Sequence, residues 1–243
     1  GLSGRPLSQG LKMMDDPLRL AVFDLDGTLV DSQHMISAAM GRAFKAAGLA
    51  VPPREAVRRI VGLSLDHAVE QLSLDMGIEH DCHAEIGEGY KKHFFELRDS
   101  GEHPEELFSG VREVLTHLDG AGWLLGIATG KTADGLHSTL DHFDLAGHFL
   151  TLQNADGGPG KPAPHMLERA ITEAGARAEN TVMIGDTSFD MEMACAAKVA
   201  GIGVSWGYHE RQDLVNAGAG CIIDDFSDLP KAAELALIKG AKA

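Results

Sequence analysis

The sequence predicts an α/β protein with a doubly wound, mostly parallel, Rossmann-like sheet and a small all-helical cap inserted after the first strand. Two observations carry this prediction. Apolar, strand-like runs alternate with helical patterns over residues 105–243, as in successive βαβ units. Residues 52–104 show helical patterns only, which indicates a separate insert.

The first strand is expected over residues 18–25, where an apolar run ends at Asp24. A turn follows at Gly27 and leads into a helix over residues 32–47, which ends at Gly48. Three helices are then expected in the insert, over residues 55–61, 64–76 and 82–97.

The rest of the chain alternates between the two kinds of element. Strands are expected over residues 123–128, 149–152, 181–184, 200–204 and 221–223. Helices are expected over residues 111–121, 132–141, 164–174, 188–197, 210–217 and 229–239. The predicted domains are a flexible leader or expression remnant (1–16), a catalytic core (17–31 and 105–243) and a helical cap (32–104).

The composition limits the classes of binding partner that we expect for this protein. The formal net charge of −15 argues against nucleic acid and anionic membranes, because both bind positive surfaces. No apolar stretch approaches the ~20 residues that span a bilayer. Three scattered cysteines suggest a reducing, cytoplasmic setting. We expect the chain to be a monomer or homodimer.

Reactive side chains follow the ends of several predicted strands. In a doubly wound sheet, ligands bind beyond these carboxyl ends. A single aspartate there is usually a turn or cap residue, and a single lysine is usually solvated, so it is their shared edge that matters. The candidates are Asp24, Asp26, Thr129, Gly130, Lys161, Asp186 and Asp190.

Asp24 and Asp26 are expected to direct both carboxylates to one side, with Leu25 facing the core. A nucleophilic carboxylate beside a second one that transfers a proton suits this arrangement. Asp186 and Asp190 lie four residues apart at the start of a predicted helix, which would place both on one helical face. Taken alone, this pair fits a helix cap and a solvated residue equally well. Together with the first pair it favours a Mg²⁺ site, because this hard ion prefers oxygen ligands.

Thr129 and Lys161 are candidate phosphate ligands. Thr129 ends an apolar strand and precedes Gly130, so its hydroxyl would lie near the N–H groups of the next helix. Lys161 precedes a proline, which stiffens its turn. A cation fixed there would neutralise charge on Asp24 and on a phosphoryl group.

These residues resemble the four motifs of the haloacid dehalogenase-like superfamily, in order and over nearly the whole chain from residue 18. They are Asp24-Leu25-Asp26-Gly27-Thr28-Leu29, Thr129, Lys161-Pro162 and Gly185-Asp186-Thr187-Ser188-Phe189-Asp190. Residues 204–208 are also similar to phosphoglycolate phosphatase-like members, and the helical insert is similar to the superfamily's mobile cap.

The resemblance implies a Mg²⁺-dependent phosphatase that hydrolyses a small phosphate monoester, such as a phosphoglycolate-like or sugar phosphate. Asp24 would form a phospho-aspartyl intermediate, and Asp26 would act as acid and then as base. Carboxylates of Asp24 and Asp186 and the backbone carbonyl of Asp26 would bind Mg²⁺, with Asp190 in the inner or second shell. Thr129 and Lys161 would hold phosphoryl oxygens.

One departure from the family pattern is Gly130, where Asn often follows the Thr; a backbone N–H would replace part of that contact. Alternatives within the superfamily are a phosphomutase and an inorganic pyrophosphatase. The mutase is disfavoured because Ile36 stands where such mutases carry a His. Outside it, a receiver-like signalling module is opposed by Asp26 and by the helical insert. An inactive scaffold is opposed by the intact charged residues at all four motif positions. Candidates for the inner surface of the cap are Arg58, Arg59, Gly62, Ser64, Lys91 and Lys92.

Overall fold

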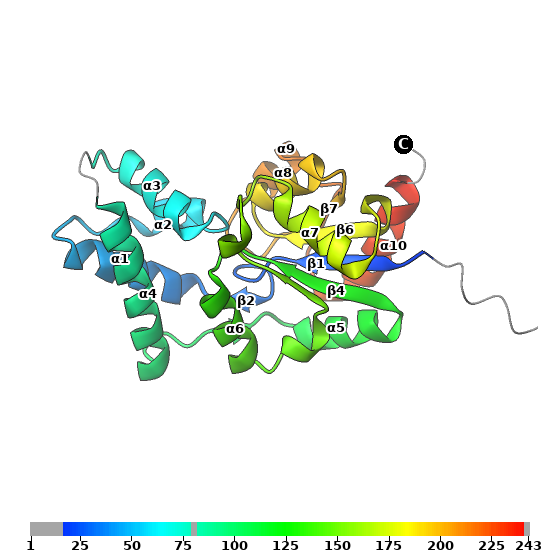
Figure 1. The fold of residues 1–243 in the computed structure, drawn as a ribbon, viewed down its shortest axis with the longest axis horizontal. Coiled ribbons are helices and arrows are strands. Elements are labelled where there is room, and N and C mark those ends of the chain that lie inside the picture. Colours follow the sequence, from blue (N-terminus) through cyan, green and yellow to red (C-terminus); the bar gives the residue numbers. More distant parts are fainter. Residues whose placement is uncertain (1–16, 79–81, 241–243) are drawn as a thin grey trace, which may run out of the picture.

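Six parallel strands form the central sheet of the computed structural model, which describes residues 17–78 and 82–240 (Figure 1). The sheet order is β5-β4-β1-β6-β7-β8. The strands are β1 (Arg19–Phe23), β4 (Trp123–Ala128), β5 (Thr151–Gln153), β6 (Thr181–Gly185), β7 (Ala200–Val204) and β8 (Cys221–Ile223). The predicted leader lies outside the described residues.

The strand order places the site. The chain runs from β1 to β4 and β5 on one side, and then crosses to β6, β7 and β8 on the other. The carboxyl end of β1 therefore lies at a point where the order reverses, which is where open α/β sheets bind ligands. The predicted doubly wound α/β class is confirmed.

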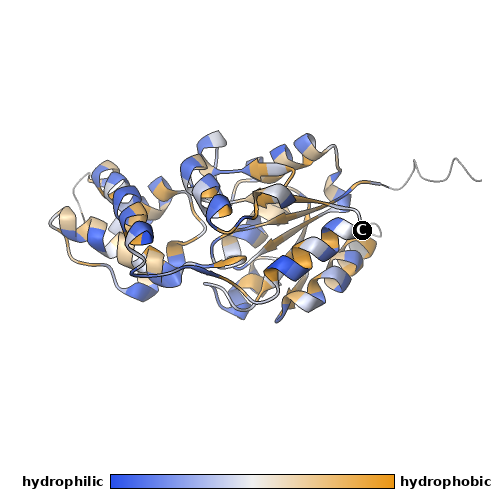
Figure 2. Cartoon of the chain, turned by 90° about the horizontal axis from the view of Figure 1, so that it is seen from below, coloured by the Kyte–Doolittle hydropathy of each residue, from blue (hydrophilic) through white to orange (hydrophobic). Residues whose placement is uncertain are grey.

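Four helices of the cap lie between β1 and β4 in sequence and form the separate lobe in Figure 1. They are α1 (Gln33–Ala46), α2 (Arg54–Ile60), α3 (Leu65–Asp75) and α4 (His83–Ser100). Figure 2 shows hydrophobic and hydrophilic residues alternating around these helices, as expected where one stripe is buried. Their buried sides share a hydrophobic cluster separate from those of the sheet, with Phe44, Leu72 and Leu97 among its fully buried members.

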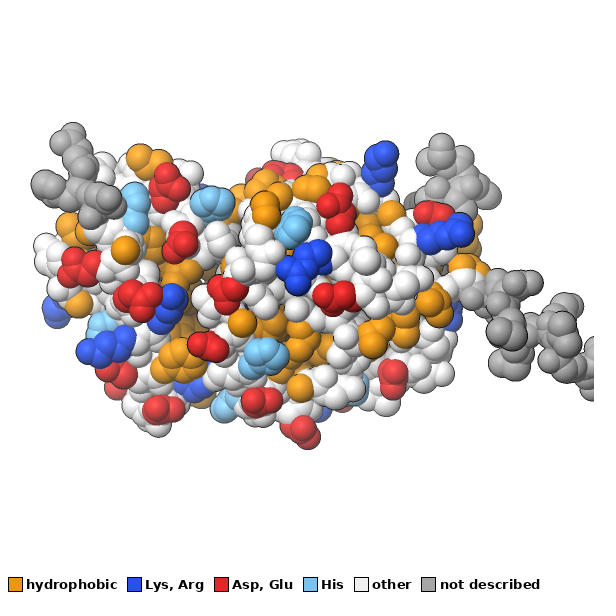
Figure 3. All heavy atoms as spheres, in the orientation of Figure 1, with side chains coloured by type: hydrophobic (Ala, Val, Ile, Leu, Met, Phe, Trp, Pro, Cys, Tyr) orange, Lys and Arg blue, Asp and Glu red, His pale blue; other side chains and the backbone are white. Residues whose placement is uncertain are grey.

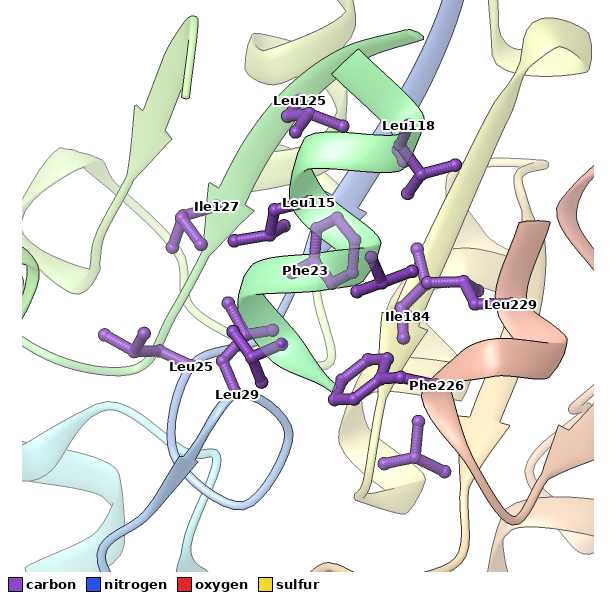
Figure 4. Packing of buried hydrophobic residues seen from close by; sticks show 14 of the residues in the cluster. Phe23, Leu25, Leu29, Leu115, Leu118, Leu125, Ile127, Ile184, Phe226 and Leu229 are labelled. Atoms are coloured by element: carbon purple, nitrogen blue, oxygen red, sulfur yellow. The ribbon is translucent and has the colours of Figure 1, made fainter. Parts of the chain in front are cut away.

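Alternation along the strands covers both faces of the sheet. In β1, Ala21 and Phe23 belong to one hydrophobic cluster, whereas Leu20 and Val22 belong to the other. Figure 4 shows Phe23 beside Leu115 in the first cluster. The first cluster includes side chains from α5 (Val111–Gly120), α6 (Ala133–His142) and α10 (Leu229–Gly240). The second includes side chains from α7 (His165–Ala174) and α8 (Ser188–Ala196); α9 (Arg211–Asn216) packs beside α8 and β8.

Two differences from the predicted elements have local causes. Strand β5 begins at Thr151 rather than at residue 149, because Phe149 places its ring edge-on to Phe23, with centroids 6.5 Å apart, and follows a short 3₁₀ turn instead of joining the ladder. A two-stranded antiparallel sheet, β2 (Val30–Asp31) and β3 (Glu106–Leu107), was not predicted. Each of its strands is too short to show a period.

The base of the cap is tied to the core by Arg98 at the end of α4. Its guanidinium contacts Glu105 Oε2 through Nε at 3.0 Å and Nη2 at 2.5 Å. It also donates to the hydroxyls of Ser138 and Thr139 on α6, at 2.7 and 3.0 Å. Because the Glu105 side chain is only 1% exposed, Arg98 is the main group that compensates its buried negative charge.

None of the described helices is long and apolar enough to span a bilayer.

Replacing Arg98 with Met should destabilise the protein by roughly 3 kcal/mol or more, because Glu105 would stay buried without its cation. Urea unfolding followed by circular dichroism would measure this. The control is Arg42→Met, which breaks the exposed pair with Glu102 and should cost less than ~1 kcal/mol. Equal losses in the two variants would contradict a structural role for the Arg98 pair.

Candidate active site

Asp24 and Asp186 meet because their strands are neighbours. Phe23 of β1 is paired with Ile184 of β6, and the Asp24 N–H donates to the Ile184 carbonyl at 2.9 Å. Each aspartate follows its strand at the same edge of the sheet. Both are almost fully buried, and Leu25 points into the core as expected.

Lys161 lies at the centre of this group. Its Nζ is 2.9 Å from Asp24 Oδ1 and 2.6 Å from Asp190 Oδ1, and its side chain is fully buried. The charges of Asp190 and Asp24 outweigh the desolvation of the ammonium, so the pKa of Lys161 is raised and the side chain stays charged. The structure therefore fixes a cation against the predicted nucleophile.

Asp186 is held by two donors. The Thr28 hydroxyl donates to Oδ1 at 3.0 Å, and the Tyr208 N–H donates to Oδ2 at 2.7 Å. Gly27 makes room for this carboxylate: a Cβ there would lie 2.2 Å from Asp186 Oδ2, and its φ of +83° is one that side chains disfavour. Thr28 and Tyr208 were not assigned these contacts from the sequence.

Asp190 is arranged differently from the prediction. Helix α8 begins at Ser188 with Thr187 as its N-cap, so Asp186 precedes the helix, and the expectation that both aspartates share a helical face is wrong. Thr187 donates its N–H and its hydroxyl to Asp190 Oδ2 at 3.0 and 2.9 Å. The Thr187 Oγ1 also accepts the Asp190 N–H at 3.4 Å, which together with the Thr187 N–H contact makes a capping box. The box orients the other oxygen, Oδ1, toward Lys161.

The buried cluster carries more negative than positive charge. Asp24, Asp186 and Asp190 place one carboxylate oxygen each within 4.8 Å of one another, and Lys161 supplies one positive charge. Burial, followed by the charge of Asp190, raises the pKa of Asp186 to about 7. Burial, followed by the charge of Asp190, raises the pKa of Asp24 well above its usual range, although Lys161 opposes the rise.

These residues fit a divalent cation. Asp24 Oδ2 is buried without a hydrogen-bond partner among the described residues. Such orphaned oxygens are costly unless a ligand compensates them. Three oxygen donors and a surplus of negative charge suit a hard ion such as Mg²⁺. The side chain of Asp26 is not part of this group.

The Asp26 carboxylate instead contacts Lys131. Lys131 Nζ lies 3.1 Å from Asp26 Oδ2 and 4.5 Å from the ring centre of Phe94 on cap helix α4. Lys131 therefore touches both the predicted acid and the cap. Lys131 was not among the site residues predicted from the sequence. The only indication of its role was its position two residues beyond Thr129, just after β4.

Thr129 and Gly130 follow β4, next to β1. The Thr129 Oγ1 accepts the Lys131 N–H at 3.2 Å, which leaves the hydroxyl proton available to a ligand. A Cβ at Gly130 would lie only 2.4 Å from the Leu63 carbonyl oxygen of the cap. The missing side chain at this position therefore has a structural reason, since it lets the cap loop approach the core.

Two of the residues expected on the inner surface of the cap, Gly62 and Lys91, line a cavity beside Asp26. Arg58 does not. It donates to the carbonyls of Gly207 and Tyr208 at 3.4 and 3.0 Å, so it fastens the cap to the core.

The fold and the site together define an α/β hydrolase with an inserted helical cap. The haloacid dehalogenase-like hydrolase family matches residues 21–204, and the chain belongs to that family. The chain is 36% identical over 221 residues to the "Probable phosphatase IndB" of Dickeya dadantii, covering 90% of this chain and 95% of the relative. It is 28% identical to a phosphoglycolate phosphatase of Vibrio parahaemolyticus, covering 89% and 96%.

A solved structure shares the architecture. The crystal structure of a hydrolase from Pseudomonas syringae matches with a TM-score of 0.78 at 27% identity, covering 88% of this chain and 96% of that one. These comparisons confirm the phosphatase class that the sequence motifs indicated.

The raised pKa of Asp186 predicts the effect that Mg²⁺ bound at this cluster would have on the stability of the protein. Without metal, the folded state keeps a proton that the unfolded chain loses above its ordinary pKa of 3.8. The contribution of Asp186 to the free energy of unfolding therefore falls as pH rises from about 4 to 7, because the buried carboxyl must ionise above that range. A cation relieves that charge, so the Mg²⁺-induced rise in Tm should be larger at pH 8 than at pH 5.

Thermal unfolding with and without Mg²⁺ at both pH values tests this. In Asp186→Asn the dependence of the Mg²⁺ effect on pH should weaken. A Tm increase that is equal or larger at pH 5 would contradict a metal bound by this cluster.

The close approach at Gly130 gives a second prediction. Gly130→Ala should lower kcat/KM for p-nitrophenyl phosphate about tenfold or more, because the added methyl group pushes the Leu63 loop and the cap away from the site. The control is Gly120→Ala, where a Cβ meets nothing within 4 Å. Wild-type kinetics in Gly130→Ala would show that cap approach at this loop is unimportant.

Proposed function

We propose that the protein is a Mg²⁺-dependent phosphatase that hydrolyses small phosphate monoesters through a phospho-aspartyl intermediate on Asp24. The observation that carries this proposal is the buried contact of Lys161 with Asp24 and Asp190 at the end of the sheet, beside Asp186. A fixed ammonium next to a carboxylate nucleophile is suited to stabilising the charge of a transferring phosphoryl group.

Asp24 is oriented for attack by contacts to one of its oxygens. Oδ1 accepts the Leu25 N–H at 2.7 Å and contacts Lys161, whereas Oδ2 is without a hydrogen-bond partner among the described residues. Attack forms a bond from Asp24 to phosphorus and breaks the bond from phosphorus to the leaving oxygen. Because the pKa of Asp24 is raised, additional positive charge is needed to keep this carboxyl ionised at neutral pH.

The surroundings of Asp26 support a role in proton transfer. It borders the cavity under the cap, and Lys131 holds its Oδ2. Asp26 would give its proton to the leaving alkoxide and then remove one from the water that attacks the phosphoryl group. Inorganic phosphate and the free Asp24 carboxylate are the products of this second step.

Mg²⁺ would be held by Asp24, Asp186 and the backbone carbonyl of Asp26, with Asp190 available as a further ligand or as a support. When bound, it supplies the positive charge that offsets these carboxylates and the phosphoryl oxygens. Lys161 and the Thr129 hydroxyl would bind phosphoryl oxygens from the protein side.

The superfamily alternatives receive less support. A phosphomutase would need a proton-handling side chain where Ile36 lies, and Ile36 is buried in the apolar lining of the cavity. The name of the Vibrio parahaemolyticus relative makes phosphoglycolate one substrate to examine, together with sugar phosphates.

Turnover of p-nitrophenyl phosphate tests the proposed function. Activity should require Mg²⁺, disappear with a chelator and fall roughly 10³-fold or more in Asp24→Asn, which cannot form the intermediate. Asp31→Asn makes the same change at an exposed aspartate and should keep wild-type activity. Full activity in Asp24→Asn would refute the assignment of the nucleophile.

A further inference from the structure

We propose that the cavity beside Asp26 selects compact phosphate monoesters whose leaving alcohol is apolar and uncharged, and that Tyr90 and Phe94 of the cap are its specificity residues. This inference rests on the proposed phosphatase function and narrows the class of substrate. It concerns the group that leaves, whereas the cluster around Lys161 concerns the phosphoryl group.

The cavity lies between the cap and the end of β4. Asp26, Lys131 and Thr132 border it on the core side, and the cap supplies most of the remaining wall. Figure 3 shows hydrophobic side chains in the hollow between the cap lobe and the core. The apolar lining includes Ile36, Met40, Ile60, Leu65, Tyr90 and Phe94.

The cavity has a volume of about 90 Å³ and is partly open to solvent, so a leaving group larger than this volume extends out of it. An apolar cavity of ~150 Å³ binds benzene, so this one suits a smaller group, such as a branched chain of a few carbons. Removing such a group from water is favourable by about 0.8 kcal/mol per methylene, which corresponds to roughly fourfold in affinity. The apolar wall therefore favours binding of a hydrocarbon group next to Asp26.

Two aromatic side chains of α4 give the wall its shape. The rings of Tyr90 and Phe94 lie 5.9 Å apart between centroids. Phe94 is only 4% exposed, and its ring also contacts the ammonium of Lys131. Lys131 is thereby held between the ring and Asp26, rather than extending into the cavity as a free cation.

The distribution of charge disfavours an acidic leaving group. Among the described residues lining the cavity, the cationic side chains are Lys91 and Lys131, and both have acidic partners. Lys131 contacts Asp26 at 3.1 Å, and Lys91 contacts Glu88 at 2.7 Å. A carboxylate entering the cavity would lie near Asp26 and would lose hydration without a cation of its own, which is costly.

A matched pair of esters tests the inference. Isobutyl phosphate and phosphoglycolate have the same arrangement of heavy atoms, with an isopropyl group in one where the other has a carboxylate. The wild-type enzyme should hydrolyse isobutyl phosphate with at least a tenfold higher kcat/KM. The matching phosphonates, 3-methylbutylphosphonate and 3-phosphonopropionate, should differ in the same direction as inhibitors and in calorimetric affinity, where no bond is broken.

Variants identify the residues responsible. Phe94→Ala should reduce the preference for the isobutyl ester to about threefold or less, because the aromatic wall is lost. Tyr90→Phe should retain the preference, because the ring rather than the hydroxyl carries the apolar contact. Leu74→Ala is the control: it changes an exposed residue of the cap, 64% exposed, that does not line this cavity.

The outcomes separate this inference from the proposed function. A preference for phosphoglycolate and 3-phosphonopropionate that is lost in Lys131→Met would overturn the inference, since Lys131 would then be a carboxylate ligand. If isobutyl phosphate, phosphoglycolate and p-nitrophenyl phosphate are all left intact, the proposed function fails. The phosphonate affinities then still decide the chemistry of the cavity. If Phe94→Ala does not fold, Tyr90→Phe and the wild-type comparison still decide.

Discussion

The buried ammonium of Lys161 is the constraint on which the active edge depends. It lies between Asp24 and Asp190, and without it three carboxylates would share a desolvated space with no cation from the protein. Its charge opposes the rise in the pKa of both Asp24 and Asp186. The remaining negative charge suits a divalent ion, and binding of such an ion here would link metal binding to folding through the same residues.

The cap completes the site from the other side. The loop around Leu63 approaches Gly130 closely enough to exclude a side chain, while Arg98 anchors α4 to the core. With the cap in this position, Phe94 contacts Lys131 and an apolar wall borders Asp26. Phosphoryl chemistry and the recognition of the leaving group are thus assigned to different halves of the molecule, which meet at Asp26 and Lys131.

The sequence allowed the architecture to be predicted, together with the residues that form the buried cluster of carboxylates around Lys161. Apolar runs identified β1 and β6, and the rule that ligands bind at strand ends led to Asp24 and Asp186. Beyond the expected proximity of Lys161 to Asp24, the sequence did not allow the contacts between elements to be predicted. The pairing of Lys161 with Asp190 depends on how the loop that carries Lys161 meets the capping box of α8. The hydrophobic periodicity of the sequence contains no information about this contact.

The cap side of the site was less accessible to the same reasoning. Phe94 and Tyr90 look like ordinary buried residues of an amphipathic helix, because helical spacing does not distinguish a residue facing the hydrophobic core from one facing a cavity. Tyr208 was associated with the site only through a resemblance over residues 204–208, and its backbone N–H contact with Asp186 comes from tertiary structure. The short strands β2 and β3 were missed because each has two residues.

The central claim is that Asp24, oriented by Lys161, becomes phosphorylated during turnover. The most direct measurement is peptide mass spectrometry of enzyme quenched in acid during the first turnover of p-nitrophenyl phosphate, for the wild type and for Asp26→Asn. The leaving group of this ester departs without a proton from Asp26, so loss of Asp26 should slow the second step more than the first. The account predicts a phosphoryl group on the peptide that contains Asp24, in larger amount in Asp26→Asn. A phosphoryl group on another residue, or continued turnover with none detectable in either protein, would contradict it.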